Sequence, residues 1–260
     1  MSQSIYDKNF YEQQWVSSLE SAKIILPIVL SVLPKINSVA DFGCGTGVWL
    51  SVLKDLGVND IMGYDGAWVK EETLKIPIDK FEAVELDKKV SIRKKYDLAI
   101  SVEVAEHLPE KSARTFVETL VKSSDIVLFS AAIPLQGGTN HINEQWQDYW
   151  HNIFNEFGFI GTDYIRKKIW NIQDVEIVYR QNIVLYVKCG IECEIKNFYN
   201  EEIIWNVVHP EFFIERDKYI NLYTVSLFVL YKIGIKRTIK KIVGKKIYEC
   251  IKKMFGRKNG

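Results

Sequence analysis

Short apolar runs alternate along the chain with longer segments in which apolar positions recur every three or four residues. The short runs, bounded by Gly, Asp or Asn, are typical of buried strands, and the longer spacing is typical of amphipathic helices. Helices are predicted at 11–33, 47–56, 110–122 and 143–157. Strands are predicted at 38–42, 60–64, 81–84, 96–102, 125–131, 159–169 and 183–188. This alternation predicts an α/β fold, with a mostly parallel seven-stranded sheet and helices on both faces.

The residue composition fits a globular enzyme with one α/β domain. Of the 260 residues, 47% are hydrophobic and 26% are charged, which is ordinary usage, and a chain of this length can bury a full core. The first residues, 1–7, lack the basic start and apolar stretch of a signal peptide, so we expect the protein in the cytoplasm. Ligands of such a sheet bind at the carboxyl ends of its strands.

Positive charge is concentrated at the C-terminal end. Residues 231–260 contain 11 Lys and Arg against one acid, Glu249, and so carry +10, whereas the whole chain carries +1. Apolar residues recur there at helical spacing, which predicts an amphipathic helix with lysines on its other face. Two interpretations stay open: the apolar face packs on the protein's own domain or on a second subunit, or it contacts a membrane surface. The apolar stretch 219–231 is too short to span a membrane.

A glycine-rich turn follows the first predicted strand. Residues 41–47 read Asp-Phe-Gly-Cys-Gly-Thr-Gly, and only glycine lets backbone amides approach a ligand so closely. The second strand is closed by Asp65, where a carboxylate can accept hydrogen bonds from both ribose hydroxyls. The two features together indicate an adenosine-containing cofactor. A dinucleotide fingerprint needs a small residue at its sixth position, and Val48 stands there, which disfavours NAD.

The spacing D-x-G-x-G-x-G resembles motif I of the class I S-adenosylmethionine (SAM) methyltransferases. The segments 85–87, Glu-Leu-Asp, and 105–109, Ala-Glu-His-Leu-Pro, follow in the order in which that class binds adenine and the methionine end of SAM. The resemblance implies a Rossmann-like class I methyltransferase fold, with SAM as cofactor and S-adenosylhomocysteine (SAH) as product. It implies cofactor-binding roles for Tyr11, Asp41, Gly43, Cys44, Gly45, Asp65, Gly66, Glu85, Leu86 and Glu103.

Three segments are similar to a bacterial subgroup associated with surface-polysaccharide biosynthesis, of capsule or lipopolysaccharide. They are the leading residues 10–14, the loop 137–146 and residues 179–182. The resemblance covers roughly residues 5–190. It implies a methyltransferase domain at 1–190, whose N-terminal helix closes over the cofactor, and leaves 191–260 as a helical C-terminal extension. It also implies a small polar acceptor, such as a sugar hydroxyl or a phosphoryl or phosphoramidate group of a polysaccharide precursor.

Histidines are the candidate catalytic residues, because a hydroxyl acceptor needs a general base with a pKa near neutral. His141, in the glycine-rich loop after the fifth strand, is the first candidate, and His107, beside Glu106, is the second. In the alternative interpretation, His141 caps the helix that follows and His107 only organises the cofactor pocket. Polar and aromatic residues suited to binding a sugar come after His141, namely Gln145, Trp146 and Tyr149.

Neither a metal nor nucleic acid is an expected partner. Cys189 and Cys193 form a C-x3-C without a second pair, which is weak evidence for zinc. Glu103, Glu106 and His107 could bind a divalent cation, but E-x-x-E-H alone does not establish a metal site. The motif of amino-methylating DNA enzymes, N-P-P-aromatic or D-P-P-aromatic, is missing after the fourth strand, and the catalytic part of the chain is acidic.

Two other functions stay open at the level of the sequence. An NAD-dependent oxidoreductase would share the first strand, the glycine turn and Asp65, but Val48 and the segment at Glu106 and His107 are against it. A non-catalytic subunit with the SAM-binding fold would bind a partner through the basic tail. Such proteins often lose the glycines or the ribose acid, and this chain keeps both. The sequence is compatible with a monomer and with an oligomer.

Overall fold

The computed structural model describes residues 8–191, 203 and 205–214, with side chains from residue 16 onward. The chain divides into two compact units, Met1–Val207 and Val208–Gly260, and residues 208–214 are the described part of the second. The predicted extension with its amphipathic tail lies almost wholly outside the described residues, so its boundary at 190/191 stays a prediction. Among the helices that are described, none is long and apolar enough to cross a membrane.

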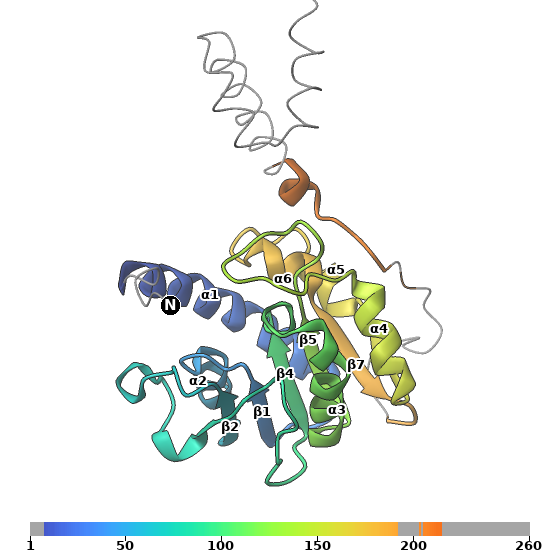
Figure 1. Cartoon of the computed structure of the whole chain (residues 1–260). Helices are drawn as coiled ribbons and strands as arrows, with labels where there is room; N and C mark the ends of the chain where they lie inside the picture. Colours follow the sequence, from blue (N-terminus) through green and yellow to red (C-terminus); the bar gives the residue numbers. More distant parts are fainter. Residues whose placement is uncertain (1–7, 192–202, 204, 215–260) are drawn as a thin grey trace, which may run out of the picture. The chain divides into compact units, whose positions relative to one another are not determined.

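Strands and helices alternate through the first unit (Figure 1). The helices are α1 Lys8–Val32, α2 Val48–Asp55, α3 Ala113–Ser123, α4 Gln147–Glu156, α5 Tyr164–Ile169 and α6 Ile177–Asn182. The strands are β1 Ser38–Phe42, β2 Asp60–Asp65, β3 Phe81–Ala83, β4 Leu98–Val102, β5 Ile126–Ser130, β6 Phe159–Thr162 and β7 Val184–Lys188. A short 3-10 turn, Ala105–His107, follows β4.

The strands form one seven-stranded sheet in the order β3-β2-β1-β4-β5-β7-β6. Only β7 runs antiparallel to its neighbours β5 and β6, and the other neighbouring pairs are parallel. The register pairs Phe42 with Tyr64, so β1 and β2 end side by side. This is the mostly parallel seven-stranded sheet predicted from the apolar runs, and it is the class I methyltransferase Rossmann-like fold.

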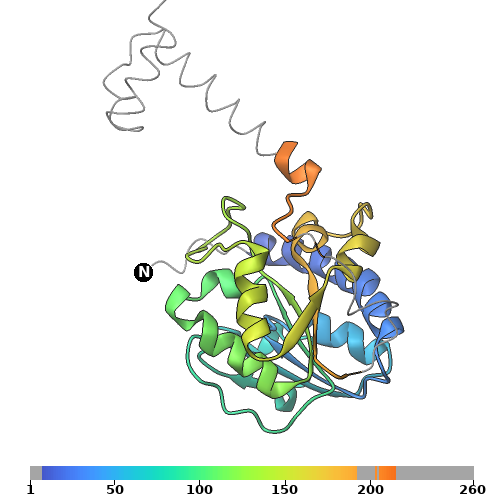
Figure 2. The same cartoon turned by 90° about the vertical axis from the view of Figure 1, so that its right-hand side faces the viewer.

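Helices cover both faces of the sheet (Figures 1 and 2), because successive strand residues point to opposite faces. Val39 of β1 packs with Ile25 of α1 and Leu50 of α2 in one apolar cluster, which also includes residues of α5 and α6. The next residue, Ala40, belongs to the second cluster, with Phe116 of α3 and Phe154 of α4. Burial on two faces explains why these strands are apolar throughout.

The segment after residue 158 differs from the sequence prediction. The strand predicted at 159–169 is wrong beyond Thr162, because α5 begins at Tyr164. Ile165 and Ile169, four residues apart, are both buried, which is helical spacing. Asp163 precedes the helix and accepts a hydrogen bond from Arg166.

Two further helices differ from the prediction. The helix predicted at 143–157 begins at residue 147, because the preceding residues bind other segments through their backbone. Asn143 N donates to Glu106 O, and Gln145 N donates to Ala132 O. Helix α6, at Ile177–Asn182, was not predicted.

Candidate active site

The loops that follow four strands meet at the carboxyl edge of the sheet. They are the glycine turn after β1, the segment from Asp65 after β2, the segment from Glu103 after β4 and the loop from Ile133 to Glu144 after β5. Parallel strands bring these ends to one edge (Figure 1), where ligands of open α/β sheets bind. The sheet therefore gathers most of the predicted site residues in one region.

At two positions of the glycine turn, any residue larger than glycine would clash with a neighbouring side chain. Gly43, Gly45 and Gly47 all have positive φ, of 86°, 52° and 80°. A Cβ on Gly43 would lie 2.3 Å from a methyl group of Val104, and one on Gly47 would lie 2.9 Å from Ile76. A Cβ on Gly45 would meet no described atom within 4 Å, so the backbone at Gly45 faces open space.

Asp65 ties the glycine turn to the end of β2. Its Oδ2 accepts a hydrogen bond from Gly45 N at 2.7 Å, and its Oδ1 accepts one from Gly66 N at 2.6 Å. Burial raises the pKa of Asp65, and the two amide hydrogen bonds lower it. A carboxylate oxygen has a second lone pair, so each can still accept a hydroxyl hydrogen bond. The geometry therefore suits the ribose role that the resemblance implies for Asp65.

Trp68 is a residue at this edge that the sequence interpretation missed. Its indole is 76% exposed. A Cβ on Gly66 would lie only 2.1 Å from the Trp68 ring, so the ring covers Gly66, next to the Asp65 carboxyl group. An aromatic residue three positions after the expected ribose acid was the available sequence signal.

Asp41 and Cys44 lie buried under the glycine turn. Burial, together with the nearby Asp65, raises the pKa of Asp41 to about 8. Burial, with repulsion from both acids, also raises the pKa of the Cys44 thiol well above its usual value. A Cβ on Gly63 would lie 2.7 Å from Cys44 Sγ, so the thiol occupies space that this glycine leaves. The side chain of Cys44 is thus a packing group, and its backbone lies in the turn.

The contacts described for the residues predicted at the adenine ring and over the cofactor do not tie them to the glycine turn or to Asp65. Glu85 is exposed and pairs with Lys88 at 2.5 Å. Leu86 is buried in the apolar cluster that includes Phe42 and Tyr64. The side chain of Tyr11 lies outside the described side chains, although its backbone belongs to α1. The cofactor roles of these three residues stay predictions.

Glu103 is held at the end of β4 by amide groups from distant segments. Glu103 has a positive φ of 55°, which is unusual for a residue other than Gly, Asn or Asp. Its N–H donates to Ser130 O at 3.0 Å, and its carboxylate accepts from Gln136 Nε2 at 2.9 Å and from Asn182 Nδ2 at 3.1 Å. Asn182 also donates to Gln136 Oε1 at 2.8 Å. Gln136 and Asn182 are site residues that the sequence interpretation did not name.

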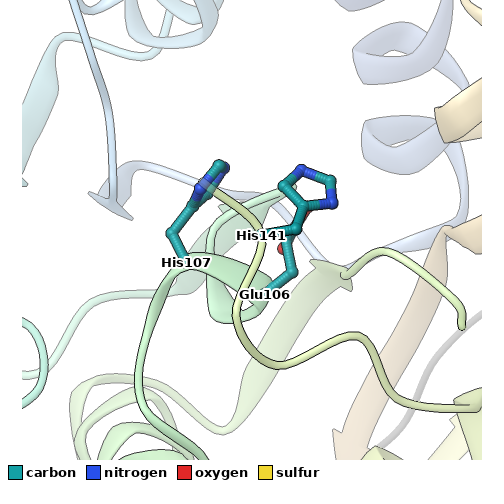
Figure 3. Close-up of side chains that lie close together, drawn as sticks. All are labelled: Glu106, His107 and His141. Carbon is teal, nitrogen blue, oxygen red and sulfur yellow. The ribbon is translucent and has the colours of Figure 1, made fainter. Parts of the chain in front are cut away.

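The two candidate catalytic histidines come together. The rings of His107 and His141 lie edge to face, with centroids 4.8 Å apart and an interplanar angle of 84°. Partial burial of the ring and the neighbouring His141 lower the pKa of His107, which is still exposed on one side, while a hydrogen bond to the Asn140 backbone acts in the opposite direction. Figure 3 shows both rings with Glu106, from the turn after β4 and from the loop after β5. The fold thus unites residues that are far apart in the sequence.

Glu144 orients the His141 ring. Nδ1 of His141 lies 3.0 Å from Glu144 Oε1, and the two Glu144 oxygens also accept from Leu135 N and Gly137 N, each at 2.7 Å. A carboxylate here favours the tautomer with hydrogen on Nδ1, which leaves Nε2 with a free lone pair. His141 is therefore positioned to accept a proton or to bind a cation through Nε2.

The predicted acceptor residues lie in the segment after His141. Gln145 Nε2 donates to Asn143 Oδ1 at 2.9 Å, and Trp146 is exposed just before α4. The Tyr149 ring packs edge to face on Trp150, with centroids 5.0 Å apart, and burial raises its pKa. Two exposed apolar side chains, Leu135 and Ile142, belong to the same loop region. The acceptor roles of Gln145, Trp146 and Tyr149 stay predictions.

A family model described as a methyltransferase domain matches residues 20–160. The match covers more than half of the chain, so the chain belongs to this family. It is a class I SAM-dependent methyltransferase domain, as the glycine turn and Asp65 indicated. No curated protein matches the chain.

Several solved structures resemble the chain. The methyltransferase domain of bacterial CtHen1-C is 19% identical, covers 66% of this chain and 98% of its own, and has a TM-score of 0.50. A complex between the Haloferax volcanii Trm112 methyltransferase activator and a methyltransferase is 15% identical, with a TM-score of 0.50. It covers 69% of this chain and 92% of its own. Magnesium protoporphyrin IX methyltransferase from Synechocystis PCC 6803, with bound SAH, is 16% identical, with a TM-score of 0.46. It covers 72% of this chain and 90% of its own. At these identities, the first two likenesses concern the fold alone.

Proposed function

We propose that this protein transfers the methyl group of SAM to an oxygen of a small polar acceptor and releases SAH. The acceptor is a sugar hydroxyl, or a phosphoryl or phosphoramidate group, of a capsule or polysaccharide precursor. One observation carries the proposal: the Asp65 carboxylate, bonded to Gly45 N, and the His107 and His141 pair belong to the same edge of the sheet. This arrangement supports a cofactor site and a proton acceptor at one edge of the sheet.

The cofactor residues fit SAM in three respects. Gly45 leaves open space beside the turn, Asp65 can accept from ribose hydroxyls, and Glu103 offers a carboxylate for the ammonium group of the methionine end. The Gln136 and Asn182 amides fix the Glu103 carboxylate, so little side-chain entropy is lost on binding. In this proposal, Gly43 contributes its backbone in the turn beside Gly45, and Gly66 contributes its backbone beside Asp65. SAM, when bound, supplies a sulfonium-bound methyl group that a nucleophile can attack.

The histidines supply the remaining chemistry in this proposal. The acceptor oxygen bonds to the methyl carbon, the sulfur–methyl bond breaks with its electron pair on sulfur, and the acceptor proton passes to His141 Nε2. Glu144 would stabilise the imidazolium that forms and would keep the hydrogen on Nδ1, which leaves the Nε2 lone pair for the acceptor proton. His107 is the second candidate base, and its lowered pKa favours the neutral ring that accepts a proton. A positioned base contributes typically about 10²- to 10⁴-fold in rate.

The subgroup, the acceptor and the location of the protein rest on the sequence. Residues 137–146 and 179–182 resemble the surface-polysaccharide subgroup, which supports a carbohydrate precursor as the acceptor. The +10 tail supports peripheral contact of a cytoplasmic enzyme with an anionic membrane surface, where such precursors are assembled, or contact with a second subunit. Nucleic acid is not part of the proposal, because the rest of the chain is acidic.

The family match decides against an NAD-dependent oxidoreductase. A non-catalytic subunit is the remaining alternative, and retention of Asp65 and of the open space at Gly45 favours an enzyme. Release of SAH during incubation with sugar, nucleotide-sugar and phosphoryl acceptors tests the two functions directly. We expect turnover with at least one carbohydrate acceptor.

Substitution of His141 tests the proton-transfer role. His141→Gln should keep SAM affinity and slow methyl transfer by about 10²-fold or more, because the residue accepts the proton but does not bind the cofactor. His151→Gln is the matched control, since the His151 ring stacks on Trp205, with ring centroids 4.1 Å apart. Full turnover by the His141 variant would show that it is not the base.

A further inference from the structure

The cluster of Glu106, His107 and His141 has a donor set that proton transfer alone does not require. Each of the three side chains offers one ligand atom, and these atoms all lie within 4.8 Å of one another. Figure 3 shows the three side chains close together, with Glu106 next to His141 and His107 on the neighbouring segment. Two imidazoles and one carboxylate form a common ligand set for divalent transition metals.

Glu106 is an unusual carboxyl group for the interior of a protein. It is fully buried, and within the described part of the chain neither of its oxygens has a hydrogen-bond partner of ordinary geometry. Burial raises the pKa of Glu106 well above its usual range, and so does Glu103, whose carboxyl group lies close enough to share a proton with it; the N–H groups of Glu106 itself and of Ala132 act in the opposite direction. A buried carboxyl group without a partner is costly, unless a cation or a proton compensates for it.

Both histidines have an oxygen partner at one ring nitrogen. His141 Nδ1 is bonded to Glu144, which is fixed in turn by two backbone amides. His107 bonds to the Asn140 backbone. Metal-binding histidines usually donate their other N–H to a carboxylate or carbonyl in this way, because that contact orients the ring and makes the ligand nitrogen more basic.

The His141 ring packs against Gly138, and backbone hydrogen bonds tie its loop to Glu106. Gly138 has a φ of 154°, and a Cβ on it would lie 2.3 Å from His141 Nε2. Ile142 N and Asn143 N both donate to Glu106 O, at 2.9 and 3.0 Å, so the backbone beside His141 is tied to the backbone of Glu106. These bonds hold the third ligand against the other two, which the E-x-x-E-H segment alone could not show.

We propose that Glu106, His107 and His141 bind one divalent transition-metal cation. Three protein ligands leave open positions, as in catalytic metal sites, and an acceptor oxygen fits such a position. The cation's role, though not its binding, rests on the proposed function. With the cation bound, His141 Nε2 is a ligand and not the base, and a hydroxyl group bound to the cation is more acidic than a free one, so its proton can pass to water. Without the cation, His141 keeps the role of base proposed above. The sequence made a metal unlikely and left metal dependence open, and the proposed site goes beyond that expectation.

Titration of the full-length, metal-free protein with Co²⁺ tests the proposal directly. We expect one Co²⁺ per chain, with the weak visible absorption of a site made of nitrogen and oxygen ligands. Glu106→Gln, His107→Ala and His141→Ala should each abolish binding or weaken it more than 100-fold. His151→Gln should bind Co²⁺ like the wild type. Circular dichroism and thermal melting of each variant establish that it is folded.

Glu144 provides a second, graded readout as a positioning residue. Glu144→Ala should weaken Co²⁺ binding by about 10- to 100-fold, in the range found for partners of metal-binding histidines. Glu144→Gln should retain part of the affinity, since its amide oxygen can still accept the proton on His141 Nδ1. A purely structural role of Glu144 would instead lower the melting temperature without this graded effect on Co²⁺ affinity.

Three results would overturn the metal site: no stoichiometric Co²⁺ binding by the folded protein, equal binding by the three ligand variants, or the intense absorption of cobalt thiolates. The last result would place the ion at cysteines. SAM titration of the same metal-free protein separates the two proposals. SAM binding without Co²⁺ binding leaves methyl transfer with a histidine base, and Co²⁺ binding without SAM binding would contradict the proposed function alone.

Discussion

At the scale of single residues, the site is defined by carboxyl groups that the fold buries and then compensates to different extents. Asp65 accepts two backbone hydrogen bonds, and Glu103 accepts two from side-chain amides. Asp41 and Glu106 are buried, and the pKa of each is raised. Such a concentration of raised carboxyl pKa values is typical of functional sites, since a structural core would use apolar residues there.

Asp41 should make stability depend on pH. Its pKa is about 8 in the folded chain, against an ordinary value of 3.8, because burial and Asp65 disfavour the charged form. The folded state therefore binds the proton more tightly, and the stability contributed by this group is present below about pH 4 and is lost as pH rises to 8. Its contribution to the slope is at most about 1.4 kcal/mol per pH unit.

Urea unfolding between pH 5 and 8 (roughly the window in which such a raised carboxyl group titrates) measures this effect. The free energy of unfolding of the wild type, minus that of Asp41→Asn, should fall steadily as pH rises. Titrating groups that do not interact with Asp41 are the same in both proteins and cancel in the difference, whereas Asp65 and Cys44 contribute through their interaction with Asp41. Asp55→Asn, at an exposed position of α2, should run parallel to the wild type. Parallel curves for Asp41→Asn as well would refute the raised pKa.

The sequence named several residues of the site but few of their partners. Asp65, Glu103 and His141 each follow a strand, and the carboxyl ends of parallel strands meet at one edge, so their approximate place was predictable. Gln136 and Asn182 reach Glu103 only through a loop and a helix end far away in sequence. No spacing rule predicts such contacts, because they depend on the packing of α6 against the sheet.

At the scale of elements, the turn between β1 and α2 is the part most closely adapted to a ligand. Its glycines serve different purposes: Gly43 admits the Val104 side chain, whereas Gly45 borders open space. The turn is anchored from below, since Gly43 N and Cys44 N both approach Tyr64 O, at 2.7 and 3.3 Å. We infer that Gly43 is needed for close packing against Val104 and that Gly45 is needed to leave space for the cofactor.

Alanine substitutions should separate these purposes. Gly45→Ala should cost about 1–2 kcal/mol of stability from its left-handed backbone, and should weaken SAM binding at least tenfold because its methyl group enters the open space. Gly57→Ala is the matched control, with a φ of 92° and equally open surroundings beyond α2, and should lose stability alone. Gly43→Ala should lose the most stability, because Val104 must also move. Urea unfolding and SAM calorimetry give both quantities.

Equal SAM affinity of Gly45→Ala and Gly57→Ala would contradict the cofactor role of the turn. The comparison does not depend on the acceptor, so it can be made before any acceptor is known. It also does not require a metal, because neither glycine is one of the proposed ligands.

The elements that the sequence failed to predict lie after β6. Strand and helix patterns are hard to separate in short apolar segments, and residues 164–169 contain the β-branched Ile165 and Ile169 at positions that also fit a strand. The tertiary packing of these residues beneath β7 decides for a helix, with Asp163 at its start. The longer apolar runs, β1, β2, β4 and β5, were predicted correctly because burial on both faces leaves little ambiguity.

At the scale of the whole molecule, the chain combines an acidic methyltransferase part with a strongly basic end. Residues 231–260 carry +10 and the preceding 230 residues carry −9, as counted from the sequence. The described side chains that we propose for the cofactor site and the histidine cluster lie between residues 41 and 182. We expect the charge asymmetry to bear on where the protein acts or on what it associates with.

The central claim, a SAM-binding site formed by the glycine turn and Asp65, is tested most directly by calorimetric titration. Purified protein is titrated separately with SAM, SAH and NAD, alongside Asp65→Ala and the control Asp55→Ala. We predict one site per chain for SAM and for SAH, no binding of NAD, and affinity for SAM that falls about tenfold or more in Asp65→Ala only. Absence of SAM and SAH binding, or unchanged affinity in the Asp65 variant, would contradict the claim.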